Sequence, residues 1–142
     1  MNEIYMKEAL KEAKKAYKKD DVPVGCIIIK DNKIIARAHN QKENKKNAIK
    51  HAEIIAISKA CKKLKTWHLD DCILYTTMEP CMMCTGAIIQ SRINKIYYSI
   101  SNESFGELEN YKLKNNKIEI EKNILANQSQ QLLRNFFEEK RK

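Results

Sequence analysis

The sequence predicts an α/β fold in which a mixed β-sheet is covered by helices on both faces. The first observation is a hairpin: the β-rich runs 24–30 and 33–38 are joined by Asp31-Asn32, a pair typical of tight turns. The second is the pattern that follows the hairpin, where segments with strand and helix periodicity alternate along the chain. This alternation is typical of helices that cross over between strands of one sheet.

Helices are predicted where apolar residues recur every three or four positions. Such segments are 3–19, 51–64, 81–91 and a C-terminal helix that carries Leu125, Leu132, Leu133, Phe136 and Phe137 on its apolar side. Further strands are predicted at 72–77, 95–99 and 117–121, and a polar loop at 39–50.

The length of 142 residues predicts a single domain, 1–142, long enough to bury roughly two thirds of its unfolded surface. No Pro/Gly/Ser-rich linker divides it. The N-terminal residues are too polar and acidic for a signal peptide. The aliphatic run 24–29 is far shorter than the ~20 apolar residues of a membrane helix. We therefore expect a cytoplasmic protein with no membrane partner.

The net charge of +9 has two interpretations. A basic surface favours nucleic acid as a partner. However, only four of the 27 basic residues are arginine, the type that binds phosphate through two parallel hydrogen bonds. The abundance of Lys, Asn and Ile instead indicates an AT-rich coding sequence, so the lysines could simply be solvated surface residues.

The five cysteines are too unevenly placed, and odd in number, to form a closed disulfide framework. Cys26, Cys61 and Cys72 stand alone in apolar surroundings and are expected to be small buried side chains. Cys81 and Cys84 form a C-x-x-C pair. Such a pair also occurs in redox sites and in structural zinc sites, but no second C-x-x-C completes a four-cysteine zinc site here.

Two motifs carry the predicted chemistry: His51-Ala52-Glu53 and Pro80-Cys81-Met82-Met83-Cys84. Each lies at a predicted helix start, where free backbone N–H groups and the positive end of the helix dipole stabilise thiolates. One histidine nitrogen and two thiolates supply three ligands for tetrahedral zinc and leave the fourth position to water. We expect one Zn²⁺ per chain, held by His51, Cys81 and Cys84.

Glu53 is predicted to be the catalytic proton carrier. Two residues after His51 it points about 200° away around a helix and is a poor second ligand. From the first helical turn it can still reach the metal-bound water and a ring nitrogen of the substrate. The combination H-x-E with P-C-x-x-C is typical of zinc-dependent hydrolytic deaminases of nucleobases. His39 and His68 lack such a context and are expected at the surface.

With these motifs the chain resembles the cytidine-deaminase-like superfamily, and most closely bacterial tRNA-specific adenosine deaminases. The resemblance covers nearly the whole chain, including the segments 22–25, 39–40, 74–88 and 91–93. It implies a three-layer α/β/α fold with a five-stranded mixed sheet, usually assembled as a homodimer. It also implies that Asn40 and Ala52 bind substrate, and that adenosine is converted to inosine at the tRNA wobble position.

Some features of the sequence favour a second hypothesis, the deamination of a free base or nucleoside such as cytosine or guanine. The segment after Gly106 is short, as in fungal-type cytosine deaminases, and Ser101–Glu107 differs from the stretch usual in tRNA enzymes. Fungal-type enzymes, however, carry a C-terminal Trp and Asp over the base, whereas the one Trp here is Trp67.

A third hypothesis is a non-catalytic, zinc-stabilised RNA-binding subunit; the presence of Glu53 argues against it. If tRNA is the substrate, basic residues beside the site are expected to contact its phosphates. These are Lys42, Lys45, Lys46 and Lys50 in the loop before His51, and Lys140, Arg141 and Lys142 at the C-terminus.

Overall fold

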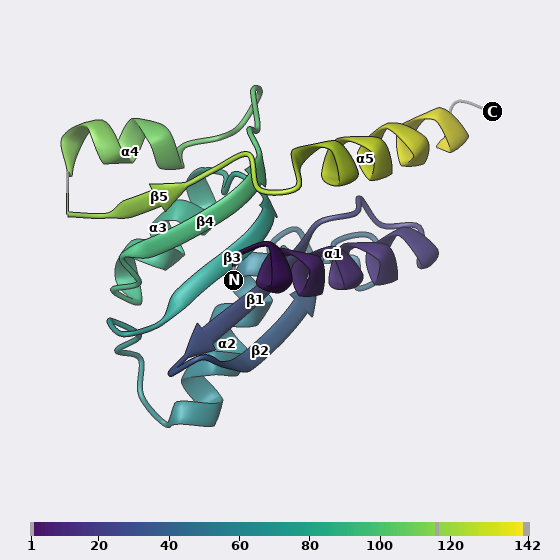
Figure 1. Ribbon diagram of the computed structural model, residues 1–142. Helices are drawn as coiled ribbons and strands as arrows, with labels where there is room; N and C mark the ends of the chain where they lie inside the picture. Colours follow the sequence, from purple (N-terminus) through teal and green to yellow (C-terminus); the bar gives the residue numbers. More distant parts are fainter. Residues whose placement is uncertain (1, 116, 141–142) are drawn as a thin grey trace.

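The computed structural model describes residues 2–115 and 117–140 and contains one five-stranded sheet in the order β2-β1-β3-β4-β5 (Figure 1). Its elements are, in chain order, α1 (Asn2–Lys18), β1 (Gly25–Lys30), β2 (Lys33–His39), α2 (Ala52–Leu64), β3 (Ile73–Met78), α3 (Met82–Gln90), β4 (Lys95–Ile100), α4 (Leu108–Lys114), β5 (Glu119–Glu121) and α5 (Ala126–Lys140).

The sheet is mixed, because β1 runs antiparallel to both β2 and β3, whereas β3, β4 and β5 run parallel. Helices α1 and α5 cover one face, and α2 and α3 cover the other (Figure 1). This arrangement confirms the predicted three-layer α/β/α fold. Because β3 and β4 are parallel, their carboxyl ends meet at one edge of the sheet, the edge where α/β proteins commonly bind ligands.

The hairpin turn between β1 and β2 has the predicted chemistry. Asp31 and Asn32 both adopt left-handed backbone conformations, with φ angles of 52° and 62°. A two-residue type I′ turn requires positive φ at both positions, and Asn and Asp tolerate it better than most residues.

Strand β1 is buried on both faces, and its side chains alternate between two hydrophobic clusters. Cys26 and Ile28 pack on the side of α2 and α3, whereas Ile27 and Ile29 pack against Met6 of α1. The period of two follows from the pleat of the strand. A central strand of this kind fixes both helical layers relative to the sheet.

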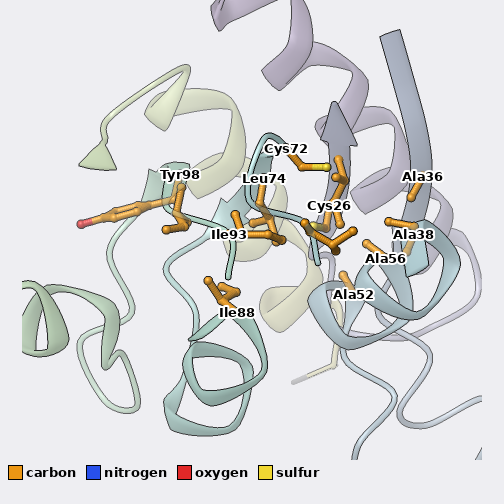
Figure 2. Packing of buried hydrophobic residues seen from close by; sticks show 14 of the residues in the cluster. Cys26, Ala36, Ala38, Ala52, Ala56, Cys72, Leu74, Ile88, Ile93 and Tyr98 are labelled. Atoms are coloured by element: carbon orange, nitrogen blue, oxygen red, sulfur yellow. The ribbon is translucent and has the colours of Figure 1, made fainter. Parts of the chain in front are cut away.

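Small side chains bring α2 close to the sheet. Figure 2 shows Ala52 and Ala56 of α2 facing Cys26 and Ala38 of the first two strands. All four are buried to within 1% of full burial. Because these side chains are short, the helix axis lies near the strands, and the start of α2 is held firmly at the sheet edge.

Three details differ from the sequence expectations. Helix α4 lies between the predicted strands 95–99 and 117–121, where the sequence predicts no element. Leu125 precedes α5 in a left-handed conformation (φ 54°), and Phe137 is 46% exposed, so neither belongs to the buried side of that helix. His39 was expected at the surface but is 8% exposed, because it pairs with Glu12 of α1.

None of the helices in the described part of the chain combines the length and apolar character needed to cross a membrane.

Candidate active site

The two sequence motifs meet at the carboxyl edge of β3 and β4. His51 is the residue just before α2, and Cys81 is the residue just before α3; both have extended backbone conformations. Neither helix start is capped by a side chain of its N-cap residue. The free N–H groups of both first turns therefore remain available to anionic ligands or thiolates.

The spacing of the three candidate ligands fits a tetrahedral metal ion. His51 Nδ1 lies 3.8 Å from Cys81 Sγ and 3.6 Å from Cys84 Sγ. Zinc–sulfur and zinc–nitrogen bonds of usual length at tetrahedral angles place these atoms about 3.6 Å apart. The three ligand atoms all lie within 4.8 Å of one another, and they form the one such group among the described residues.

The three candidate ligands shift one another's pKa values. The pKa of the Cys81 thiol is lowered to about 3, first by a hydrogen bond with Cys84 and then by one with His51. The pKa of His51 is raised, chiefly by its hydrogen bond with Cys81. The pKa of Cys84 is raised because it keeps the proton that the pair shares and because it is buried. A cation bound between these atoms would replace that shared proton, because thiolate ligands bind metal in the deprotonated form.

Glu53 lies beside the ligands but outside their group. Its side chain, on the first turn of α2, is 4% exposed and lines the same cavity as His51 and Cys81. Burial raises the pKa of its carboxyl to about 7. A buried carboxyl of this kind, next to a metal site and facing a cavity, is suited to accept and return a proton near neutral pH.

The cavity in front of these residues has a volume of about 180 Å³. At about 30 Å³ per water molecule, this is room for some six waters, or for one heterocyclic base. The wall is formed by residues from five segments of the chain: Val22, Val24, Asn40, Lys42, His51, Ala52, Glu53, Met78, Glu79, Cys81 and Asn102.

Asn40 is held in one orientation at the cavity wall. Its Nδ2 donates to the carbonyl of Val22 over 3.2 Å, and its Oδ1 accepts from the backbone N–H of Lys42 over 3.1 Å. These contacts distinguish the oxygen from the nitrogen of the amide. One further amide hydrogen and one further lone pair remain for a ligand in the cavity.

Ala52 also lies in the cavity wall, but its side chain packs in the core against the sheet (Figure 2). What it offers a ligand is its backbone N–H in the first turn of α2, which has no intrahelical acceptor.

The cavity wall includes residues to which the sequence assigned no role, notably Glu79 and Asn102. Glu79 lies within the segment that resembles deaminases, directly before Pro80 and Cys81, which was a usable signal. Asn102 comes from the loop after β4 and carried no recognisable motif.

The basic residues near the site differ in their surroundings. Lys42 lines the cavity, Lys45 and Lys46 are exposed on the neighbouring loop, and Lys50 is half-buried. Lys140 pairs with Asp20 of the segment after α1. Arg141 and Lys142 lie outside the described residues.

A three-layer fold with a His-Cys-Cys group at the starts of two helices defines a cytidine-deaminase-like protein. Residues 1–141 match the MafB19-like deaminase family, and the chain belongs to it.

Its relatives include proteins named tRNA-specific adenosine deaminase. That of Bacillus subtilis is 41% identical, with coverage of 99% of this chain and 91% of the relative. That of Aquifex aeolicus is 47% identical, with coverage of 73% and 69%.

The fold also matches solved structures. One comes from a study of A-to-I editing by tRNA:A34 deaminases; it is 31% identical, has a TM-score of 0.86, and the match covers 91% of this chain and 98% of that one. The guanine deaminase of Bacillus subtilis is 38% identical with a TM-score of 0.68, covering 78% of this chain and 74% of that one.

Proposed function

We propose that this protein is a zinc-dependent hydrolytic deaminase that converts adenosine to inosine at the wobble position of tRNA. The observation that carries the chemistry is the meeting of His51, Cys81 and Cys84 at tetrahedral spacing, with Glu53 buried beside them. In this proposal the first three residues hold one Zn²⁺ per chain.

A zinc ion held by this donor set would lower the pKa of a bound water to about 7 and so supply the nucleophile at neutral pH. The role proposed for the Glu53 carboxylate is to accept a proton from the attacking water, to protonate a ring nitrogen of the base, and to pass a proton to the departing ammonia. The amine-bearing carbon exchanges its C–N bond for a C–O bond. Such acid–base assistance contributes typically ~10²- to 10⁴-fold to the rate.

Asn40 and the backbone of Ala52 are proposed to orient the base. The fixed amide of Asn40 offers one donor and one acceptor, and the N–H of Ala52 adds a donor from the helix start. The cavity of about 180 Å³ holds a single base, so an RNA substrate has to extrude the target nucleotide into it.

The choice of tRNA rests on the relatives. Those named tRNA-specific adenosine deaminase are 40–41% identical over 96–99% of this chain for Bacillus subtilis and Streptococcus pyogenes. The exposed lysines at positions 42, 45 and 46 beside the cavity are consistent with a polyanionic substrate. A cytoplasmic location follows from that substrate.

A second candidate function is deamination of free guanine. The 38% identity to the Bacillus subtilis guanine deaminase and the TM-score of 0.84 to that of Nitrosomonas europaea favour it. The match to the Bacillus subtilis enzyme covers less of both chains than the match to the tRNA-specific relative from the same organism does.

The test is to incubate zinc-loaded protein with tRNA that carries adenosine at the wobble position and, separately, with guanine, cytosine and adenine. Ammonia release from the tRNA alone supports the proposal. Efficient release from guanine or cytosine, with none from tRNA at low salt, overturns it in favour of the second candidate.

We also propose a homodimer. Helix α3 exposes Met82 (74%) and Ile89 (36%), and a cavity of about 440 Å³ lies between α3 and α4. A second copy of the chain would cover these apolar side chains. Sedimentation at micromolar concentration tests this, and a mass of about 16.6 kDa, that of one chain, contradicts it.

A further inference from the structure

Two buried carboxylates outside the proposed catalytic group contact the two loops that wall the cavity, and one of them, Glu79, also lines the cavity itself. Asp21, between α1 and β1, is fully buried, and Glu79, between β3 and α3, is 7% exposed. Buried carboxylates are costly unless they are paired or hydrogen-bonded. Asp21 is satisfied chiefly by backbone N–H groups of one loop, and Glu79 by backbone N–H groups of a second loop and of the helix that follows it, so each ties one loop to the body of the protein.

Asp21 holds the loop between β2 and α2. Its Oδ1 accepts from the backbone N–H of Glu43 over 2.7 Å, and its Oδ2 from the backbone N–H of Asn44 over 3.1 Å. The Asn44 side chain also donates to Oδ2 over 2.5 Å. The same loop carries Lys42 and begins at Asn40, and both of these residues line the cavity.

Glu79 holds the loop between β4 and α4. Its Oε1 accepts from the backbone N–H of Asn102 over 3.3 Å, and its Oε2 from that of Glu109 over 3.2 Å. Asn102, in this loop, lines the cavity together with Asn40 and Lys42. The two hydrogen bonds join the first residues of the loop to the first turn of α4.

Gly106 shows how closely this loop is packed on Glu79. A Cβ atom at position 106 would lie 2.6 Å from Glu79 Oε1 and 2.4 Å from the carbonyl oxygen of Asn102. Gly106 also forms a β-bridge with Cys81, and the N–H of Glu107 donates to the carbonyl of Pro80 over 3.0 Å. The loop is thus fitted onto the segment that carries a candidate metal ligand.

We propose that Asp21 and Glu79 are positioning residues that hold the two cavity walls in the conformation that binds substrate. The inference rests on the proposed function of the cavity. Hydrogen bonds from N–H groups to a carboxylate are stronger than those to a neutral acceptor. When such an anchor weakens, the binding-competent fraction of the loop falls, and the apparent affinity for substrate falls by the same factor.

The first test uses Asp21→Asn and Glu79→Gln. Each change replaces one carboxylate oxygen by an NH2 group, which cannot accept a hydrogen bond from a backbone N–H. We expect KM for tRNA to rise about tenfold in each variant, while kcat stays within about twofold and zinc content is unchanged. The matched control is Asp71→Asn, an exposed carboxylate that pairs with Lys30 at the far end of β3. Its KM should equal that of the unmodified protein.

Amide hydrogen exchange gives a readout that does not depend on turnover. Asp21→Asn should speed exchange at Glu43 and Asn44 only, and Glu79→Gln at Asn102 and Glu109 only. Gly106→Ala should reproduce the Glu79→Gln pattern, because the added methyl group displaces the carboxylate.

An unchanged KM in folded, zinc-loaded variants would overturn the proposal, and so would a fall in kcat alone, which indicates only a smaller active fraction. If the protein acts on free guanine or cytosine instead of tRNA, the same KM comparison is made with that base. Failure of the proposed substrate is thereby separated from failure of the positioning role.

Discussion

His51 Nδ1 and Cys84 Sγ lie 3.6 Å apart, although the two residues are 33 positions apart in the chain. Their contact joins the start of α2 to the first turn of α3. A zinc ion bound there, as proposed, would cross-link the two helices, so removal of one of its ligands should weaken both zinc binding and folding.

The unmodified protein is expected to bind about one zinc ion per chain, and Cys84→Ser is expected to lose most of it and to unfold at a lower temperature. The reason is that serine replaces a thiolate by a weaker, protonated ligand. Elemental analysis and thermal unfolding measure these changes. Cys61→Ser, a half-buried cysteine away from the group, is the control. Full zinc occupancy in Cys84→Ser contradicts the ligand assignment.

Glu53→Ala is expected to keep its zinc and its fold but to lose at least ~10²-fold in kcat, because it removes the proton carrier and no ligand. Single-turnover rates with zinc-loaded protein check this. A rate close to normal means that another group moves the protons. Loss of zinc means instead that Glu53 supports the metal directly.

The double charge reversal Lys45→Glu with Lys46→Glu is expected to raise KM for tRNA at least tenfold and to leave zinc content unchanged. Each phosphate contact that is lost also reduces the salt dependence of binding by about 0.7–0.9 log units per decade. The control reverses Lys62 and Lys63, exposed lysines in the last turn of α2, roughly 16 Å from the start of that helix. Equal effects of the two double variants would indicate that only total charge matters.

The pair Glu12–His39 gives a pH prediction. His39 Nδ1 lies 3.4 Å from Glu12 Oε1, and burial lowers the pKa of His39 below its usual value despite this carboxylate. The positive charges of Lys19 and Lys15 lower the pKa of His39 further. The unfolded chain therefore binds a proton at His39 before the folded chain does, so this residue's contribution to stability is complete above pH 6.5 and declines below it.

Replacement of His39 by Gln should remove that decline. Urea unfolding of both proteins at pH 7.5 and pH 5.5 is the measurement, and the difference in unfolding free energy between the two pH values should be smaller for the variant. An equal difference would mean that His39 does not titrate in this range.

Much of the fold was predictable because β1 and α2 carry strong local patterns. The aliphatic run of β1, the Asp31-Asn32 turn and the helical spacing from Ile54 to Leu64 each favour one structure. Helix α4 was not predictable, because it is only seven residues long and its one fully buried apolar side chain is Leu108. A helix this short is stabilised by tertiary packing rather than by its own sequence.

Part of the candidate site was also predictable from sequence, and part was not. His51 and Glu53, and likewise Cys81 and Cys84, stand close together in the chain at spacings typical of known motifs, so the sequence alone could identify both pairs. The burial of His39 depends on Glu12, 27 residues earlier, and the anchoring of the loops by Asp21 and Glu79 depends on backbone N–H groups that any residue provides. No sequence pattern reports such contacts.

The most direct test of the central claim is nucleoside analysis of tRNA after incubation with zinc-loaded protein in ¹⁸O-enriched water. The account predicts that the adenosine at the wobble position becomes inosine that carries ¹⁸O, with release of ammonia, and that Glu53→Ala yields almost none. An unchanged wobble adenosine, together with ammonia released from guanine or cytosine by the same preparation, would contradict it.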